Sequence, residues 1–402
     1  MNQVIIIGGG AAGYFTAINA KEKKPELEVV ILEKGKEVLQ KVKISGGGRC
    51  NVTHACFDPK ELVEFYPRGG KELLGPFHQF MTGDTFEWFE NRGVPLKIED
   101  DNRVFPQANT SQAIIDCFQK AVDTLGIKVL KNHGVNSVSR EENKWIVKTK
   151  EQIFEADKLV IAAGSSKKVW QLCERIDHTI IAPVPSLFTF NIKDKRLIDL
   201  LGTSVPNATV KIRNTKLEAS GPLLITHLGM SGPAVLKLSA FGARILADKN
   251  YQYNVEVNWL SRPTTKVLNI LLNLKKKAPR KTVILKSPFT EISRRLWERF
   301  VVASEIQSTQ NWADLNSRQL ENLANQLTKG VFNANGRTTF KDEFVTAGGV
   351  DLKEVNFKRF ESKKHKNLFF VGEVLNIDAV TGGFNFQNAW TGGVICAGAL
   401  CD

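Results

Sequence analysis

The segment that most constrains the fold is a glycine-rich turn directly after a short apolar run at the start of the chain. The run, Val4–Gly8, is rich in β-branched residues, as fully buried parallel strands are. The turn, Gly8–Gly13, reads GGGAAG, which fits G-x-G-x-x-G, and a helical pattern follows it. A second apolar run, Val29–Leu32, ends on Glu33, twenty residues after Gly13. This order of elements predicts an α/β domain that binds a dinucleotide.

Each glycine of the turn has its own task. Gly8 permits the tight turn, Gly10 lets the backbone approach a pyrophosphate, and Gly13 lets the helix pack against the strand. The helix N-terminus directs its N–H groups at the phosphates, and Glu33 would accept hydrogen bonds from a ribose. The predicted contacts here are Gly8, Gly10, Ala11, Ala12, Gly13, Glu33 and Lys34.

A second glycine cluster begins twelve residues after Glu33. Consecutive glycines expose backbone N–H groups and allow positive φ, so they can fold closely around a long ligand. A nicotinamide enzyme has no obvious need for this cluster, which therefore favours FAD as the dinucleotide. The alternative to a ligand-binding loop is a flexible surface loop. The predicted contacts are Ser45, Gly46, Gly47, Gly48, Arg49, Cys50 and Asn51.

The C-terminal part supplies a further strand, Asn367–Val371, which is followed by Gly372 and Glu373. A glycine-opened helix of small residues then begins near Gly383, and its positive end would stabilise negative charge on a reduced flavin. Another buried run, Lys158–Ile161, ends in a turn of small residues. The predicted contacts from these parts of the chain are Val135, Ala162, Ala163, Gly164, Gly372, Glu373, Gly383, Asn385, Phe386 and Gln387.

Five motifs spread over nearly the whole chain are specific in combination. They are GGGAAG at Gly8, ISGGGRCNVTH from Ile44, THLGMSGPAVL from Thr226, TAGGV from Thr346 and FFVGEVLNIDAVTGGFNFQNAWTGG from Phe369. Together they resemble the YhiN/BaiN-type bacterial flavoproteins, a group that includes aminoacetone oxidase-like proteins and bile-acid-intermediate reductases. The resemblance implies an FAD-dependent oxidoreductase with non-covalent FAD. It also implies a glutathione-reductase-like Rossmann domain with an inserted β-barrel domain and a helical sub-domain.

The middle of the chain agrees with this architecture. Apolar and polar residues alternate from about Pro185 to Trp259, as in half-buried antiparallel strands, and the apolar spacing then becomes helical. The expected domains are the FAD-binding domain over 1–184 and 346–402, the β-barrel over 185–260 and 329–345, and the helical insert over 261–328.

One segment departs from the family pattern. Members usually continue the Ala-x-Gly-Gly turn into a loop with Thr-Gly-Ser and Gly-Asp-Gly elements. Here Ala163–Ser166 runs straight into Lys167–Trp170. If this segment shapes the substrate side of the flavin, the substrates of the family are not expected to apply to this chain. The shortened loop is also compatible with a flavoprotein that has lost catalytic turnover.

The sequence offers few indications of which residues lie on the substrate side of the flavin. Candidates are His227, Arg49 and Asn51, with histidine suited to general acid–base chemistry near neutral pH. The alternative is that His227 only holds its loop together by hydrogen bonds. Because a second G-x-G-x-x-G is absent, no dedicated nicotinamide domain is expected, and NAD(P)H is a candidate only as a transient reductant.

Composition narrows the cellular setting. The 402 residues are 42% hydrophobic and 24% charged, without an apolar run of the ~20 residues that cross a bilayer, which predicts a soluble cytoplasmic protein without a membrane partner. The opening residues are too short an apolar stretch for a secretory signal. Six cysteines occur without a Cys-x-x-Cys pair, so we expect free thiols, no dithiol reductase and no metal site.

The formal charge of +13 allows two interpretations: an ordinary solvated surface, or attraction for anionic ligands such as nucleotides or RNA. Residues 261–300 hold eleven Lys and Arg against two Glu. The main prediction is hydride transfer to or from a small molecule. A flavin-dependent RNA-modifying protein is a second hypothesis, although the basic stretch lacks interleaved aromatic residues and a known RNA-binding motif. A non-catalytic flavin-binding protein is a third.

Overall fold

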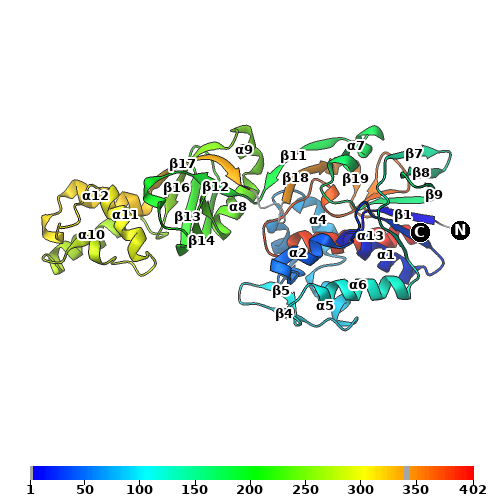
Figure 1. The fold of residues 1–402 in the computed structure, drawn as a ribbon, viewed down its shortest axis with the longest axis horizontal. Coiled ribbons are helices and arrows are strands. Elements are labelled where there is room, and N and C mark those ends of the chain that lie inside the picture. The colour runs from blue at the N-terminus through cyan, green and yellow to red at the C-terminus, as the bar shows by residue number, and fades with distance from the viewer. Residues whose placement is uncertain (1–2, 339–344) are drawn as a thin grey trace. The chain divides into compact units, whose positions relative to one another are not determined.

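The computed structural model describes residues 3–338 and 345–402. The chain divides into two compact units, Met1–Val184 with Lys341–Asp402 and Pro185–Phe340, so the first unit is built from both ends of the sequence (Figure 1). The expected last barrel segment, 329–345, includes residues 339–344, which lie outside the described ones. Among the helices of the described residues, none is both long and apolar enough to span a membrane.

The first unit is organised around a seven-stranded sheet of order β19-β20-β21-β10-β1-β2-β6. The strands from β21 to β6 run parallel, and β19 and β20 add an antiparallel edge. In chain order the bounds are β1 Gln3–Ile7, β2 Glu28–Leu32, β6 Lys128–Leu130, β10 Lys158–Ile161, β19 Val355–Asn356, β20 Glu361–Ser362 and β21 Leu368–Phe370. The chain leaves β1 toward β2 on one side, while β10 lies on the other. This reversal marks the place where doubly wound sheets bind ligands.

An aromatic core joins the two ends of the sequence within this unit. Phe15 on α1 (Ala11–Lys23) lies 4.4 Å from Trp88 on α5 (Thr82–Glu90), measured between ring centroids. It lies 4.9 Å from Trp390 on α13 (Phe384–Cys401). Phe118 on α6 (Gln112–Thr124) contacts the same rings. The C-terminal helix is therefore part of the N-terminal core.

Two small antiparallel sheets accompany the parallel one. One has the order β3-β5-β4, and the other, β7-β8-β9, packs against β1 and β10. Their bounds are β3 Thr53–His54, β4 Leu96–Ile98, β5 Arg103–Pro106, β7 Ser137–Glu141, β8 Lys144–Lys148 and β9 Ile153–Ala156. A third sheet pairs β11 (Ile180–Ser186) with β18 (Val345–Val350). The shorter helices are α2 Gln40–Gly48, α3 Pro59–Leu62, α4 Gly70–Phe77 and α7 Lys167–Arg175.

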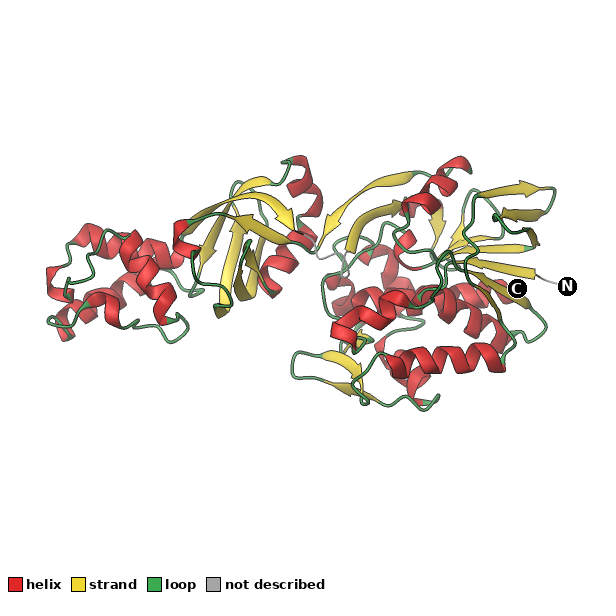
Figure 2. Ribbon diagram, viewed as in Figure 1, coloured by secondary structure: helices red, strands yellow, loops and turns green. Residues whose placement is uncertain are grey.

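The second unit contains a closed six-stranded barrel of order β12-β15-β14-β13-β16-β17 (Figure 2). Its alternating apolar residues point inward, as the sequence pattern predicts. The bounds are β12 Thr189–Ile192, β13 Ser204–Ile212, β14 Glu218–Thr226, β15 Gly229–Ser231, β16 Gln252–Asn258 and β17 Gly330–Thr338. Helices α8 (Pro233–Phe241) and α9 (Ala243–Asp248) connect β15 to β16.

A helical insert between β16 and β17 shares the core of the barrel. It comprises α10 Thr264–Lys277, α11 Arg294–Ala303 and α12 Ser317–Thr328. The ring of Trp259, next to the end of β16, lies 5.4 Å from Phe300 on α11 and 5.9 Å from Phe332 on β17. Because one apolar core runs through both parts, the insert is fixed to the barrel. The expected fold class, a Rossmann-type domain with a β-barrel and a helical sub-domain, is confirmed.

Candidate dinucleotide site

The predicted contacts gather where parallel strands end. β1 runs into Gly8, β2 into Glu33, β10 into Ala162–Gly164, and β21 is followed by Gly372. Since the strands are parallel, their carboxyl ends meet at one edge of the sheet, which is where α/β folds bind ligands.

The turn after β1 has room only for glycine at two places. Gly8 has φ +118°, and a Cβ there would lie 2.5 Å from the Ala162 carbonyl oxygen. A Cβ on Gly13 would lie 2.1 Å from the Gly8 carbonyl oxygen. These two glycines hold the first turn of α1 against β1 and the loop after β10.

Gly10 differs from its neighbours because open space surrounds it. It is the N-cap of α1, has an extended conformation and makes no side-chain cap, and a Cβ there would meet nothing within 4 Å. The first turn of α1, which starts with Ala11 and Ala12, contains no acidic residue. Its free N–H groups and the partial positive charge of the helix end suit an anion. The residues present therefore fit a pyrophosphate.

Glu33 is held in place by backbone donors. Its two carboxylate oxygens accept hydrogen bonds from Gly9 N–H at 2.9 Å and from Gly35 N–H at 2.7 Å. A carboxylate oxygen accepts more than one hydrogen bond, so each can also accept one from a ribose hydroxyl. Glu33 thus closes the turn and presents a fixed acceptor.

The loop after β6 lies beside Glu33 and Lys34. A Cβ on Gly134 would be 3.4 Å from the Lys34 Cβ, and the adjacent Val135 is buried. The backbone N–H of His133 donates to the Glu33 carbonyl oxygen at 2.8 Å. The structure therefore brings Val135 and Lys34 to the same corner of the edge.

The second glycine cluster forms the kinked end of α2. Gly46, Gly47 and Gly48 have φ of +56°, +68° and +83°, and Cys50 also has a positive φ. Around Gly47 and Gly48 there is open space for a Cβ. Successive left-handed residues direct N–H groups outward, which suits contact with a polar ligand. Burial raises the pKa of the Cys50 thiol to about 12, so this thiol stays protonated.

Arg49 and Asn51 both have partners within the protein. The Arg49 guanidinium lies 2.7 Å from the Glu99 carboxylate and stacks over the Phe105 ring at 3.9 Å. Asn51, in the amide orientation that satisfies both atoms, donates to the Thr53 carbonyl oxygen at 3.0 Å and accepts from Gly383 N–H at 3.1 Å. Asn51 therefore links the glycine loop to the start of α13.

The loops after β10 and β21 lie next to each other and to α1. A Cβ on Gly164 would be 3.8 Å from a carboxylate oxygen of Glu373, and one on Gly372 would be 3.0 Å from the Ala12 Cβ. Lys41 on α2 forms an ion pair with Glu373 at 2.5 Å. Glu373 and Gly164 therefore lie in one group with the turn after β1.

The start of α13 is stabilised by side chains that point into the core and by a glycine at its N-cap. Gly383 is the N-cap with φ +93°, and a Cβ there would lie 2.5 Å from the Thr53 carbonyl oxygen. Gln387 is fully buried, and its amide oxygen accepts from Thr53 at 2.6 Å. The Asn385 side chain accepts from Ala379 N–H, and the Phe386 ring stacks on Trp390. The side chain of Gln387 thus stabilises the helix start from inside.

Sequence reasoning missed the strongest polar contact of this region. Arg68 pairs through two nitrogens with Asp378, which is fully buried and lies in the loop before α13. The partners are 310 positions apart, so no local pattern announces them. An acid within an apolar run, such as Asp378, is the signal that a buried partner must exist.

His227 lies in the second unit. It occupies the exposed two-residue turn between β14 and β15, whereas Arg49 and Asn51 lie in the first unit. Of the three predicted catalytic residues, Arg49 and Asn51 therefore lie in one unit and His227 in the other.

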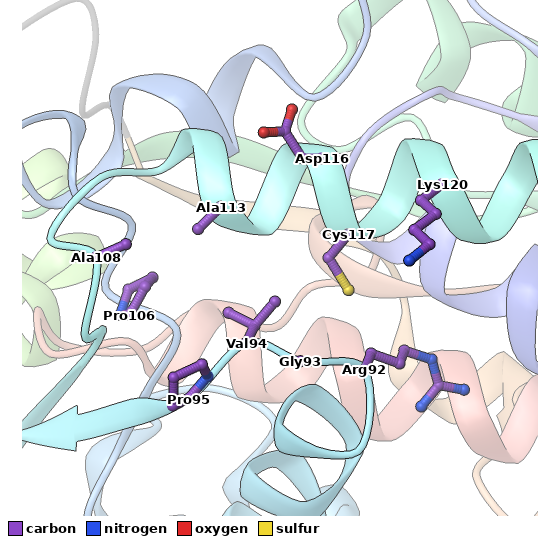
Figure 3. A pocket seen from close by; sticks show the side chains of 10 residues that line it. All are labelled: Arg92, Gly93, Val94, Pro95, Pro106, Ala108, Ala113, Asp116, Cys117 and Lys120. Atoms are coloured by element: carbon purple, nitrogen blue, oxygen red, sulfur yellow. The ribbon is translucent and has the colours of Figure 1, made fainter.

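A hollow of about 280 Å³ lies elsewhere on the first unit, between α6 and the segments on either side of β4 and β5 (Figure 3). Arg92, Val94, Asp116, Cys117 and Lys120 are among its lining residues. Arg92 already pairs with Glu22 and stacks on Trp88. The lining of this hollow contains no residue of the dinucleotide site, and we assign the hollow no ligand.

Relatives match this chain over nearly its full length. The ribosomal RNA dihydrouridine synthase of Haemophilus influenzae is 28% identical, with 98% of this chain and 97% of the relative covered. The Escherichia coli protein of the same name is 27% identical over 98% and 96%. The 3-dehydro-bile acid delta(4,6)-reductase of Clostridium scindens is 26% identical over 100% of both chains.

Solved structures show the same fold at low identity. The 3-ketosteroid delta1-dehydrogenase of Sterolibacterium denitrificans has a TM-score of 0.52 at 11% identity, with 100% of both chains covered. The 3-ketosteroid-delta4-(5alpha)-dehydrogenase of Rhodococcus jostii has a TM-score of 0.51 at 11% identity, with 98% and 97% covered. The model of the HI0933-like protein Rossmann domain matches residues 2–399. This chain therefore belongs to the HI0933-like family of FAD-dependent oxidoreductases.

Proposed function

We propose that this protein is an FAD-dependent reductase of a carbon–carbon double bond conjugated to a carbonyl group, and that its substrate is a uridine in ribosomal RNA. The observation that carries this proposal is the full-length match to two ribosomal RNA dihydrouridine synthases, which extends over both units. The third relative, a delta(4,6)-reductase, supports the same type of reaction on another molecule.

The two named activities share one chemical problem. Uracil has a C5–C6 double bond conjugated to its C4 carbonyl, and a 3-oxo steroid with unsaturation at C4 has the equivalent arrangement. Bound reduced FAD supplies the hydride, and the second hydrogen arrives as a proton. The carbonyl takes up electron density during the transfer, so a nearby hydrogen-bond donor or acid accelerates it.

The residues of the first unit would bind and orient the cofactor. The start of α1 holds the pyrophosphate, Glu33 the ribose, and the glycines of the α2 kink the middle of the molecule. The positive end of α13, fixed by Asn51 and by the Arg68–Asp378 pair, would face the ring portion. Gln387 stabilises this helix start from the core side, because its amide oxygen accepts from the Thr53 hydroxyl.

His227 is the candidate acid of the second unit. It is exposed at a hairpin turn, and among the described residues its side chain has no hydrogen-bond or ion-pair partner that would hold it for structural reasons alone. His227→Ala should lower turnover by about 10²-fold while leaving the flavin spectrum intact. Unchanged kinetics would remove it from the mechanism. For the electron donor we propose NAD(P)H docking transiently over the flavin.

The proposal can be tested by measuring dihydrouridine in ribosomal RNA. RNA from cells lacking the gene would be compared by mass spectrometry with RNA from the same cells carrying the wild-type gene. We expect dihydrouridine in the ribosomal RNA that disappears with the gene and returns with it. Equal dihydrouridine in both would refute the RNA substrate.

A small enone is the second candidate substrate, favoured by the bile-acid reductase among the relatives. It is distinguished by offering the reduced holoenzyme a 3-oxo steroid with a conjugated double bond in place of RNA. Rapid oxidation by the steroid and none by RNA would assign the small-molecule activity. A flavin that neither substrate oxidises would support a non-catalytic flavin-binding protein.

A further inference from the structure

The excess positive charge of this protein lies entirely in its second unit. Residues 185–340 contain 23 of the 55 Lys and Arg and 10 of the 42 Asp and Glu, and the remainder of the chain has 32 of each. The first unit is thus formally neutral, while the barrel and the helical insert together carry the +13.

The charge is most one-sided along α10 and the segment that follows it. Residues 257–290 contain eight Lys and Arg and no acidic residue. Four cations lie within six positions, and all four are exposed; we call them the α10 cluster: Lys276, Lys277, Arg280 and Lys281. Within the described part of the chain, no carboxylate forms an ion pair with any of these four.

Other cations of the insert do have acidic partners. Arg262 pairs with Glu291, and Arg294 pairs with Glu298 at 2.9 Å. Cations of the insert can therefore be neutralised by carboxylates of the same unit. Among the described residues, the four cations of the α10 cluster are not neutralised in this way.

The helix end explains only part of the cluster. Lys276 and Lys277 lie in the last turn of α10, where the helix dipole favours cations. Arg280 and Lys281 lie beyond the helix, in a segment whose backbone is fixed. The Lys281 carbonyl oxygen accepts from Trp312 N–H at 3.0 Å, and the Pro279 carbonyl oxygen accepts from Ala313 N–H at 3.0 Å. The cluster is presented from an ordered backbone.

We propose that the α10 cluster docks the phosphate backbone of structured RNA, an inference that rests on the RNA substrate proposed above. The cofactor does not need these cations, because the neutral first unit offers a pyrophosphate the backbone N–H groups at the start of α1. A steroid-like enone carries no phosphate for them to meet. RNA does, and neutralising its phosphates with lysine and arginine releases counterions, which drives binding.

The surroundings of the cluster favour backbone contact over base stacking. The exposed large apolar side chains of the insert are aliphatic, namely Leu272, Leu285 and Val302, whereas its Trp297 and Trp312 are buried. Stacking of unpaired bases needs exposed aromatic rings. The insert therefore suits the phosphates of a folded RNA. The positions of these phosphates depend on the shape of the RNA and not on its base sequence.

The test compares two full-length, FAD-loaded variants with equal loss of charge. In the docking variant, Lys276, Lys277, Arg280 and Lys281 are all replaced by Gln. In the control, four exposed lysines of the first unit are replaced by Gln: Lys71, Lys128, Lys148 and Lys150. Binding to deproteinised bacterial ribosomal RNA is measured at several salt concentrations. Flavin content and thermal unfolding of both variants show that neither is misfolded.

We expect the docking variant to bind this RNA at least about tenfold more weakly near physiological salt, and the slope of log K against log salt to fall by about 3. The control should stay within about twofold of wild type. Equal losses in both variants, or none in either, would overturn the proposal. So would equally tight binding of vesicles rich in phosphatidylglycerol with the same dependence on the cluster.

Failure of the docking site and failure of the RNA substrate have different signatures. If the cluster sets RNA affinity but wild-type protein leaves every uridine unreduced, the proposed substrate is wrong and the binding result stands. If wild-type and docking variant reduce uridine in RNA with equal kcat/KM at low RNA concentration, the substrate stands and the docking site is wrong.

Discussion

The two units differ in how they use charge. The first unit has 32 basic and 32 acidic residues, and its candidate anion site consists of backbone N–H groups at a helix start and a glycine kink. The second unit carries all of the +13 on its barrel and helical insert. In the proposed site, a cofactor with two phosphates would be held by backbone N–H groups without net positive charge on the unit. The cations of the second unit need another explanation, and a polyanionic partner supplies it.

The largest effect is expected from Gly13→Ala, which tests whether the first unit depends on backbone packing. The new Cβ would lie 2.1 Å from the Gly8 carbonyl oxygen, so we expect loss of the folded state in chemical denaturation. Gly10→Ala is the matched control, because its Cβ meets open space. It should change the free energy of unfolding by less than about 1 kcal/mol and still release FAD on gel filtration. Full FAD retention in Gly10→Ala would contradict the pyrophosphate placement.

The next effect concerns the buried ion pair of the first unit. Asp378→Asn removes the fully buried carboxylate charge that pairs with Arg68, which should cost about 3–5 kcal/mol of unfolding free energy. In the second unit, Glu298→Gln breaks the exposed pair with Arg294 and should cost no more than about 1 kcal/mol. Urea denaturation of both variants measures the contrast. Similar values for the two would show that Asp378 does not fix the α13 start.

Glu33→Ala tests the ribose contact. A hydrogen bond to a charged group contributes about 1.5–3 kcal/mol, so FAD should bind roughly ten- to a hundredfold more weakly. Glu37→Ala, in the same loop but exposed, is the control and should bind FAD as wild type does. Fluorescence titration of the apoproteins with FAD gives both dissociation constants. Equal constants in the two variants would rule out Glu33 as the ribose acceptor.

The smallest effect is acid sensitivity of the first unit. Partial burial opposes ionisation of Glu354, but hydrogen bonds from Lys364, Thr179 and His178 outweigh it and lower its pKa from 4.5 to about 2. Because this pKa is lowered by folding, the stabilisation is complete above pH 4.5 and is lost as the pH falls toward 2. Glu354→Gln should flatten the decline of unfolding free energy over this range. An unchanged pH profile in the variant would show that the network contributes nothing.

The sequence predicted the parts of the site that depend on backbone conformation. Gly8, Gly13 and Gly383 occupy positions where a Cβ would collide with a carbonyl oxygen, and such positions leave a glycine in the sequence. Strand and helix periods are local, so they indicated the Rossmann-type part of the fold, whereas the inserted barrel and helical sub-domain were implied by the resemblance and agreed with the periodicity. Contacts between distant side chains were not predictable. Arg49 meets Glu99 fifty positions away, and nothing near either residue indicates the other.

The sequence predicted the domain in which each candidate catalytic residue lies, but not the contacts that the residue makes. His227 was a candidate because histidine suits acid–base chemistry near neutral pH, and it lies in the second unit; Asn51, in the first unit, ties its loop to Gly383. The uneven charge was visible in the composition, but only the division into units shows that the first is neutral.

The most direct test of the central claim is anaerobic single-turnover oxidation of the reduced holoenzyme by ribosomal RNA that lacks dihydrouridine. Absorbance near the usual flavin band at ~450 nm is followed after mixing. We predict that the band returns with RNA and that one dihydrouridine forms per flavin oxidised. A band that stays bleached with RNA but returns with a conjugated 3-oxo steroid would contradict the RNA substrate, and protein that binds no FAD would contradict the site itself.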